Sequence, residues 1–172
     1  ELFANSPHEV AVHTLTHPRL EQFTTVSALY EILEDKKNLE QMFGKIVRGM
    51  AYPFGTSSDE LEAAIRACGG IVYARATGSS NSIEIPKNWM HLAPTCHHNS
   101  EKLFELGDKL INDEPRRAAK LMYVWGHSYE FDRNDNWHVI EEFAKKMAFR
   151  DDIWYATNIE IFDYILAYRS LI

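Results

Sequence analysis

The chain has 172 residues, 45% of them hydrophobic and 12% aromatic, which is enough to bury one sizeable core, so we expect a single domain over residues 1–172. Its net charge of −7, without a cluster of Lys and Arg among aromatic residues, excludes nucleic acid as a partner. No apolar run approaches the roughly 20 residues that a membrane-spanning helix needs, so we predict no membrane span.

Hydrophobic periodicity predicts strands and helices in alternation. Short runs with a period of two predict strands, and longer runs with apolar residues three or four positions apart predict helices. Gly44 marks the end of one helix and Ser58 the start of the next. In chain order, the pattern predicts a strand at 8–13, a helix at 26–43, a strand at 45–52, a helix at 59–69, a strand at 71–74, a helix at 101–111, a strand at 120–125, a helix at 137–149, a strand at 153–155 and a helix at 158–168.

This alternation is typical of the α/β class, in which helical crossovers join parallel strands in a barrel or an open sheet. One long irregular stretch, residues 76–99, contains Trp89, Met90 and Pro94, which favours an ordered loop that covers a site. In such folds ligands bind at the C-terminal ends of the strands. The residues that follow each strand are therefore the candidates for chemistry.

Two histidines follow the first predicted strand, in the segment HTLTH at 13–17. An extended chain would place His17 about 13 Å beyond His13, whereas two nitrogens on one metal ion lie within about 4 Å of each other. The chain must therefore curl after His13 to bind a metal, and Pro18 fits such a break, with one helical turn bringing both side chains to one face. By itself the spacing also fits two unrelated polar loop residues.

Two later strand ends carry further candidates. After the second strand, Pro53 fixes the backbone and Gly55 permits close approach to a ligand, so this turn could present backbone amides. After the fourth strand, His127 follows Trp125 and Gly126 and could act as a general acid. Each segment alone also fits an ordinary turn or a buried histidine, so their order along the chain decides the interpretation.

The segments HTLTH, AYPFG, NW and WGH, in this order, resemble the polysaccharide deacetylases of carbohydrate esterase family four, the NodB-homology domain. The resemblance implies an α/β fold built as a (β/α) barrel, a distorted TIM-type barrel, here incomplete at its N-terminus. It implies metal-dependent hydrolysis of acetyl groups on an acetylated polysaccharide or oligosaccharide. We expect the divalent metal to be zinc, with cobalt, nickel and manganese as alternatives, and the protein to be secreted or in the cell envelope.

The resemblance also assigns roles to residues. It implies His13 and His17 as metal ligands, the amide of Phe54 as a donor to the oxyanion, and His127 as the acid that protonates the leaving amine. It further implies that Tyr52, Pro53, Trp89 and Trp125 contact the substrate, and that the indoles of Trp89 and Trp125 form the walls of the acetyl pocket.

The chain departs from the family pattern at several positions. Ala51 stands where the family has an arginine, for which the nearby Arg48 could compensate, and Asn88 stands where an aspartate is common. The family's first motif, T-F-D-D-G, has no counterpart before His13, so the aspartate base and the metal's aspartate are missing from the chain as printed. Two histidines without a carboxylate predict weak metal binding and poor activity. The chain is then a fragment, a degenerate member, or completed by a partner chain.

Two other hypotheses stay open. One is a carbohydrate-binding relative that holds a glycan without hydrolysing it, through Tyr52, Trp89 and Trp125. The other is a structural metal site in the segment CHH at 96–98; adjacent histidine side chains diverge on most backbones, so we expect ordinary loop residues there. Cys68 and Cys96 form one disulfide or none, and we expect core thiols.

Overall fold

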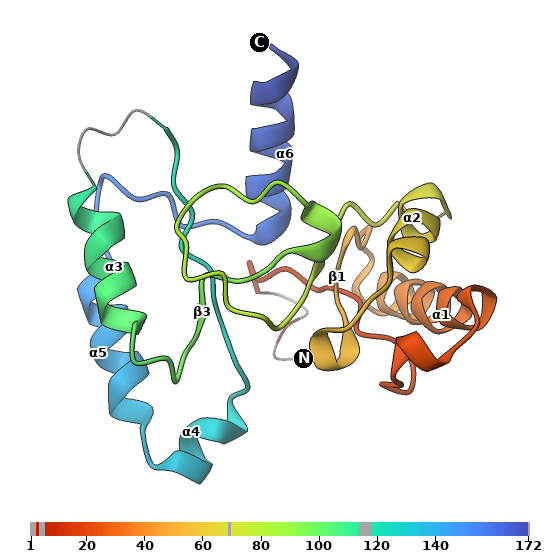
Figure 1. The fold of residues 1–172 in the computed structure, drawn as a ribbon, viewed down its shortest axis with the longest axis horizontal. Helices are drawn as coiled ribbons and strands as arrows, with labels where there is room; N and C mark the ends of the chain where they lie inside the picture. Colours follow the sequence, from red (N-terminus) through yellow and green to blue (C-terminus); the bar gives the residue numbers. More distant parts are fainter. Residues whose placement is uncertain (1–2, 4–5, 69, 114–117, 172) are drawn as a thin grey trace. The chain divides into compact units, whose positions relative to one another are not determined.

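The structure, a computed structural model, describes residues 3, 6–68, 70–113 and 118–171. It divides the chain into two compact units. The first comprises Glu1–Thr77, Asn88–Leu92 and Tyr155–Ile172, and the second comprises Gly78–Lys87 and Ala93–Trp154. Each unit has its own strands and helices (Figure 1). The expectation of one domain over the whole chain stays a prediction.

The first unit is built on short parallel strands. Its elements are η1 Leu20–Gln22, α1 Thr25–Phe43, β1 Gly49–Ala51, η2 Pro53–Gly55, α2 Asp59–Cys68, β2 Tyr73–Arg75, η3 Trp89–His91 and α6 Asn158–Ser170. Strand β1 pairs in parallel with β2, Val12 forms a parallel bridge with Met50 of β1, and Leu92 forms one with Arg75 of β2. Four parallel segments therefore lie side by side, and the chain leaves them at a common edge.

The helices of this unit begin and end where local signals place them. The Thr24 side chain accepts the N–H of Ser27 at the start of α1, and Gly44 ends the helix in the left-handed region at φ 63°. Ser58 Oγ accepts the N–H of Leu61 at the start of α2, and Thr157 forms a capping box at the start of α6. The predicted helix positions are confirmed, apart from Gly69, which lies outside the described residues.

The core of the first unit joins α1 and α2 to the strands. The two helices lie side by side (Figure 1) and bury Ala28, Ile32, Leu61 and Ile65. The rest of this cluster comes from the strands and the segments around them: Val12, Leu20, Val47, Met50, Tyr52, Ile71, Ala74 and Met90. Burial of these apolar side chains holds the strand ends, and the residues that follow them, in fixed positions.

The second unit repeats the arrangement with different packing. Its elements are β3 Cys96–His97, α3 Leu103–Asn112, β4 Val124–Trp125, α4 Tyr129–Asn134 and α5 Trp137–Met147. Strands β3 and β4 are parallel. Helices α3 and α5 lie side by side (Figure 1), and Gly107 allows the Phe143 ring to approach α3, since a Cβ there would lie 2.8 Å from it.

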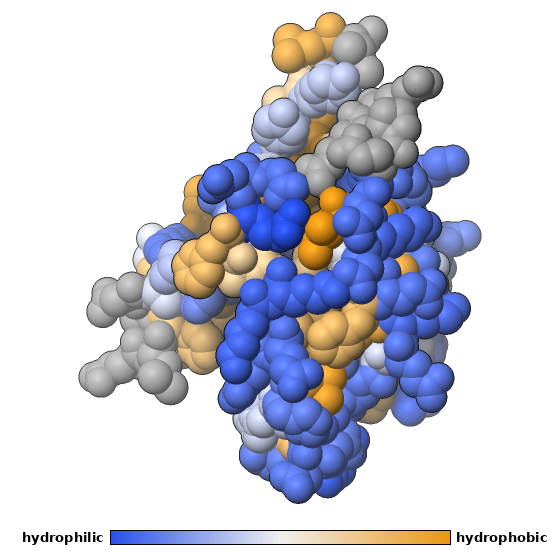
Figure 2. Space-filling view, turned by 90° about the vertical axis from the view of Figure 1, so that its left-hand side faces the viewer, coloured by the Kyte–Doolittle hydropathy of each residue, from blue (hydrophilic) through white to orange (hydrophobic). Residues whose placement is uncertain are grey.

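On the face that Figure 2 shows, hydrophilic residues predominate, with small hydrophobic areas between them.

The strands differ most from the prediction. The strand expected at 8–13 is reduced to the bridge at Val12. The strand expected at 45–52 forms only at Gly49–Ala51 (β1), and the one expected at 120–125 forms only at Val124–Trp125 (β4). The expected strand at 153–155 does not form, while β3 lies inside the segment predicted as a long loop. Strand pairing depends on neighbours distant in sequence, which alternation along the chain does not encode.

The fold class is confirmed at the level of a mixed α/β structure with short parallel strands. Within the described residues the strands form two separate two-stranded sheets, and these do not close into a barrel. None of the helices in this part of the chain combines the length and apolar character that crossing a bilayer requires. Both cysteines are free: Cys96 is buried, as predicted, but Cys68 is exposed at the end of α2 and is not a core thiol.

Candidate functional site

His13 and His17 lie next to each other in the first unit. Their ring centroids are 4.8 Å apart in an edge-on arrangement, so the predicted curl after His13 is confirmed. The curl is not a helical turn. Thr14 and His17 adopt positive φ angles of 71° and 56°, and the hydroxyl of Thr14 accepts the N–H of His17 at 3.1 Å. Two left-handed residues therefore reverse the chain within the motif.

Two carboxylates of α1 hold this curl. Glu31 accepts the N–H and the hydroxyl of Thr16 at 2.9 and 3.0 Å, and Asp35 accepts the N–H of His13 at 2.8 Å. Glu31 is buried, so its two bonds to Thr16 are partly shielded from water and contribute more than bonds on the surface, whereas the bond from His13 to Asp35 is exposed. The positions of the two imidazoles are thus set by a helix that the sequence predicted but whose contacts it did not reveal.

One ring nitrogen of His13, Nδ1, forms a hydrogen bond, and Nε2 has none among the described contacts. Its Nδ1 lies 2.8 Å from the carbonyl oxygen of Ala51, to which it donates when it carries the proton. Although His13 is exposed as a residue, desolvation of its imidazole lowers the pKa of His13; the Ala51 carbonyl opposes this effect, and His17 and Arg75 add to it. The neutral imidazole, with its second N–H on a backbone carbonyl, is the form in which histidine usually binds a metal.

The spacing of the two rings also fits a metal. Two imidazoles that bind one zinc ion at about 2.1 Å place their ring centroids about 4.5–5.2 Å apart. The observed 4.8 Å falls within this range, and both residues are exposed. The separation of His13 and His17 is therefore compatible with the binding of one divalent ion.

Phe54 extends the same cluster. The ring centroids of Phe54 and His17 are 4.8 Å apart. The guanidinium of Arg19 lies over the Phe54 ring, 4.4 Å from its centroid. Phe54 has a φ of 57°, which is unfavourable for a bulky residue. Of the six non-glycine residues with positive φ in the described part of the chain, three are Thr14, His17 and Phe54, so backbone strain concentrates in the two segments of this cluster.

Tyr52 and Pro53 are not surface residues. Tyr52 has no exposed surface, and its hydroxyl donates to the carbonyl of Met90 at 2.8 Å; burial raises the pKa of this phenol, and the charge of Glu62 adds to the effect. Pro53 is buried as well. The predicted substrate contacts through these two side chains are corrected accordingly, because Tyr52 packs in the core and fixes η3.

Trp89 and Arg48 contact α6. Trp89 is half-buried, and its ring meets that of Phe162 edge-on at 5.3 Å. Arg48 forms a bidentate ion pair with Asp163, at 2.7 and 2.9 Å, which raises the pKa of the guanidinium. The expectation that Arg48 compensates for Ala51 is therefore wrong, because its guanidinium is already bound; the cation beside Phe54 is Arg19.

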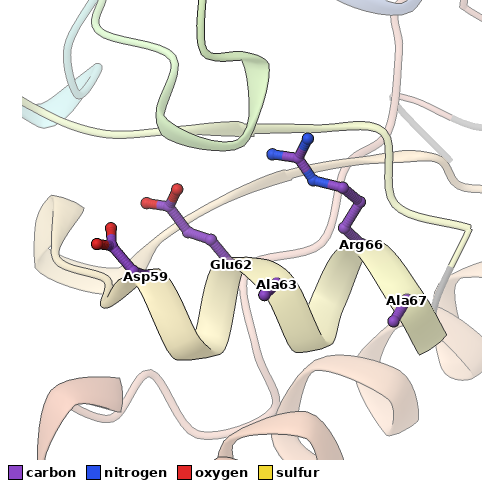
Figure 3. Close-up of a pocket in the computed structure, with 5 residues that line it drawn as sticks. All are labelled: Asp59, Glu62, Ala63, Arg66 and Ala67. Atoms are coloured by element: carbon purple, nitrogen blue, oxygen red, sulfur yellow. The ribbon is translucent and has the colours of Figure 1, made fainter.

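Helix α2 carries a hollow of about 310 Å³ whose side chains Asp59, Glu62 and Arg66 point to one side (Figure 3). Glu62 accepts hydrogen bonds from Ser57 at 2.6 Å and Asn88 at 3.2 Å. Burial alone would raise the pKa of Glu62, but its donors, with His91 Nδ1 at 3.0 Å, lower it. Ser57 and Glu62 both contact Nδ1 of His91, so the His91 ring cannot relay a proton between these two residues. The contacts connect η3 to α2.

In the second unit, residues at the end of β3 and directly after β3 and β4 surround Glu130 of α4. The Nε2 atoms of His97 and His98 lie 3.0 and 2.9 Å from Glu130 Oε2. The backbone N–H of His127 donates to the same oxygen at 3.1 Å, and Nδ1 of its ring lies 3.5 Å from it. The predicted acid His127 thus belongs to a histidine–glutamate cluster, which we define as His97, His98, His127 and Glu130.

The two adjacent histidines do not diverge as predicted. Their ring centroids are 4.3 Å apart and tilted by only 31°, and His98 packs on Phe131 at 4.2 Å. Gly126 makes this possible, because a Cβ at that position would lie 1.7 Å from the His98 ring. Trp125 meets His97 edge-on at 4.8 Å and is half-buried. The segment CHH is therefore part of a packed site and not an ordinary loop.

The cluster holds an ionised carboxylate. Burial opposes the charge on Glu130, but the N–H of His127, the ring of His98 and the charges of His97 and His127 together lower its pKa to about 2. Burial lowers the pKa of His97, and the charge of His98 adds to this. The ligand atoms of His97, His127 and Glu130 lie within 4.8 Å of one another, so these three residues could hold a metal ion.

Residues 1–72 match the family model described as polysaccharide deacetylase. The match covers 72 of the 172 residues. The family is metal-dependent and acts on acetylated carbohydrate, and the matched stretch contains the curl, the histidine pair and the Phe54 turn. The predicted resemblance is thereby confirmed for residues 1–72.

A solved structure, Streptococcus pyogenes deacetylase PplD in complex with acetate, is similar at 27% identity, with a TM-score of 0.37. The match covers 39% of this chain and spans 29% of that one. The comparison with curated proteins gave no match.

Sequence reasoning missed Glu130, and it assigned His98 to an ordinary loop. The only local signal was the spacing of three residues between His127 and Glu130, which allows a side chain to reach back to a backbone N–H at the start of a helix. His97 and Glu130 are 33 positions apart, and only the parallel pairing of β3 with β4 brings them together.

Proposed function

We propose that this chain functions as a metal-dependent polysaccharide deacetylase, which removes acetyl groups from an acetylated polysaccharide or oligosaccharide. One observation carries the proposal: His13 and His17 lie 4.8 Å apart, with His13 Nδ1 on the carbonyl of Ala51, inside the stretch that matches the family. His13 Nε2 and a nitrogen of His17 would hold the ion. When bound, a divalent ion polarises the acyl oxygen and lowers the pKa of water.

The chain's own residues supply the other functions that we propose. The backbone amide of Phe54, held at a φ of 57° in a rigid turn, would donate a hydrogen bond to the oxyanion. His127 would protonate the leaving amine. Trp89 and Trp125 would contact the sugar, since both are half-buried and present part of an indole to solvent. We propose zinc as the ion because imidazole ligands suit it. We also propose that the protein is secreted or lies in the cell envelope, as the family resemblance implies.

The test has two measurements. Zinc binding is measured by calorimetry, and acetate release is measured with acetylated chito-oligosaccharide and xylo-oligosaccharide. His17→Ala should weaken zinc binding at least tenfold, because it removes one of two ligands. His138→Ala is the matched control: His138 is an exposed histidine of α5 outside both histidine groups, and its loss should leave zinc binding unchanged.

The cluster around Glu130 could also take up zinc, so the measurement is repeated with His97→Ala. Zinc binding that depends on His17 in both backgrounds supports the proposal. Zinc binding that is unaffected by His17→Ala, or acetate release that persists in that variant, contradicts it.

A further inference from the structure

Glu130 holds the residue His127 from two sides. Glu130 Oε2 accepts the backbone N–H of His127 at 3.1 Å, and the backbone N–H of Glu130 donates to the carbonyl of His127 at 3.1 Å. The Glu130 side chain is only 12% exposed, so its carboxylate has little freedom to turn away. The contact between these two residues is therefore built into the start of α4.

We infer that Glu130 is the positioning residue of His127: it keeps the neutral imidazole in the form that carries its proton on Nδ1, and leaves Nε2 as the nitrogen that exchanges a proton with a ligand. The relevance of this nitrogen to deacetylation rests on the proposed function. The placement of the proton does not, because it follows from the contacts within the second unit.

The other two histidines fix the carboxylate. Nδ1 of His97 accepts the N–H of Asn99 at 3.1 Å, so the proton of the neutral ring is on Nε2, 3.0 Å from Glu130. Nδ1 of His98 is buried and has no hydrogen-bond partner among the described residues. A proton there would leave a buried donor unpaired, so His98 also carries its proton on Nε2 and donates it to Glu130.

His127 then faces an anion whose position is fixed by two ring donors and one backbone donor. Its Nδ1 lies 3.5 Å from Glu130 Oε2. A nitrogen lone pair facing a carboxylate oxygen repels it, whereas an N–H attracts it, so the proton is favoured on Nδ1. Nε2 lies on the opposite edge of the ring, and the side chain is half exposed.

Neighbouring rings limit the rotation of His127. Tyr129 lies 5.2 Å from it at 31°, and Trp125 lies 5.7 Å from it at 70°. Arg133 contacts the other carboxylate oxygen of Glu130 at 3.5 Å from an exposed side chain. The ring therefore packs near two aromatic side chains, while its Nδ1 lies 3.5 Å from Glu130.

The same contacts disfavour a metal in the cluster, although three ligand atoms lie within 4.8 Å of one another. A histidine that binds a metal through Nε2 normally donates its other N–H. In His97 the other nitrogen instead accepts the N–H of Asn99, so a metal would have to displace the Nε2 proton and break that bond.

The experiment records the tautomers of the histidines by long-range ¹H–¹⁵N correlation on the ¹⁵N-labelled full chain, at a pH where the rings are neutral. We expect His127 to be mainly Nδ1-protonated, and His97 and His98 to be Nε2-protonated. Glu130→Gln should reduce the Nδ1-protonated form of His127 to less than half, because the amide N–H can face Nδ1 instead.

Asp132→Asn is the matched control. It removes the same charge from the same helix, and Asn keeps the acceptor that binds Nε1 of Trp137 at 2.8 Å. This variant should leave the tautomer of His127 unchanged. Equal responses of His127 to the two variants would overturn the inference, since a general loss of charge would then explain both.

Other outcomes are also decisive. A wild-type His127 that is mainly Nε2-protonated, or zinc that replaces the His97 proton at stoichiometric concentration, overturns the inference. If Glu130→Gln does not fold, the wild-type tautomers of His97, His98 and His127 decide alone. Failure of the proposed function, seen as no zinc on His13 and His17, would leave these tautomers as they are, so the two failures are distinguishable.

Discussion

Both units place histidines where short parallel strands end, but they occupy the ring nitrogens differently. In the first unit, His13 uses one nitrogen on a backbone carbonyl, and no carboxylate oxygen contacts either ring of the pair among the described contacts. In the second unit, three histidines surround one carboxylate oxygen. The first arrangement leaves a neutral nitrogen free to bind an ion, and the second sets where protons lie.

The difference shows that a histidine's chemistry depends on its hydrogen-bond partner more than on its neighbours in sequence. HTLTH at 13–17 and CHH at 96–98 both looked uncertain as sequence motifs. In the first motif, the Ala51 carbonyl binds Nδ1 of His13 and leaves Nε2 to bind a metal. In the second motif, Glu130 keeps the protons of His97 and His98 on Nε2. Three measurements test this contrast.

The largest effect is expected from Gly126→Ala, which should break the second unit alone. The added Cβ would lie 1.7 Å from the His98 ring, which is buried and cannot move away. We expect the free energy of unfolding of this unit to fall by about 3 kcal/mol, as for overpacking in a core. Urea unfolding followed by tryptophan fluorescence measures it, because Trp125, Trp137 and Trp154 all belong to the second unit.

Gly78→Ala is the control for that change. It lies in the same unit, has no heavy atom within 4 Å of an added Cβ, and should change stability by less than about 0.5 kcal/mol. Zinc binding by the histidine pair of the first unit should persist in both variants. Equal stability of the two alanine variants would contradict the close contact between Gly126 and His98.

An intermediate effect is expected on acidification. The pKa of Glu130 is lowered from 4.5 to about 2 in the folded chain, so the unfolded state binds a proton first. The stability that this carboxylate contributes is therefore fully present above pH 4.5 and is lost as the pH falls toward 2. Amide exchange of the second unit, measured across this range, should accelerate, and Glu130→Gln should remove that part of the pH dependence.

Glu62 in the first unit has a lowered pKa as well, so stability there should decline with the same sign. Glu130→Gln should leave the pH dependence of the first unit unchanged. If it altered both units equally, the two carboxylates would not act independently, and the contrast between the units would fail.

The smallest effect is expected from Arg48→Ala in the first unit. The ion pair with Asp163 is bidentate but partly exposed, so its loss should cost about 0.5–1 kcal/mol, and less at high salt. Lys45→Ala is the control, since no ion pair of Lys45 is recorded among the described contacts. A loss of stability that is independent of salt would show that packing against α6, and not the charge, is what Arg48 contributes.

Helices could be predicted from the sequence to within a residue or two because their signals are local. Thr24, Gly44, Ser58 and Thr157 set the boundaries of α1, α2 and α6 through contacts within four positions of the cap. The short helix α4 was missed because six residues carry too little periodicity. The strands were overestimated because their length is decided by partners distant in sequence, such as Val12 for β1 and Leu92 for β2.

The sequence by itself determined the α/β class, the similarity of residues 1–72 to the polysaccharide deacetylase family model and the requirement that the chain curl between His13 and His17, because each depends on spacing and residue type. Only the tertiary structure decided which nitrogen of His13 is free, that Tyr52 and Arg48 are already engaged, and that Glu130 collects three histidines. These depend on hydrogen bonds between residues brought together by strand pairing and core packing, and no local pattern records such contacts.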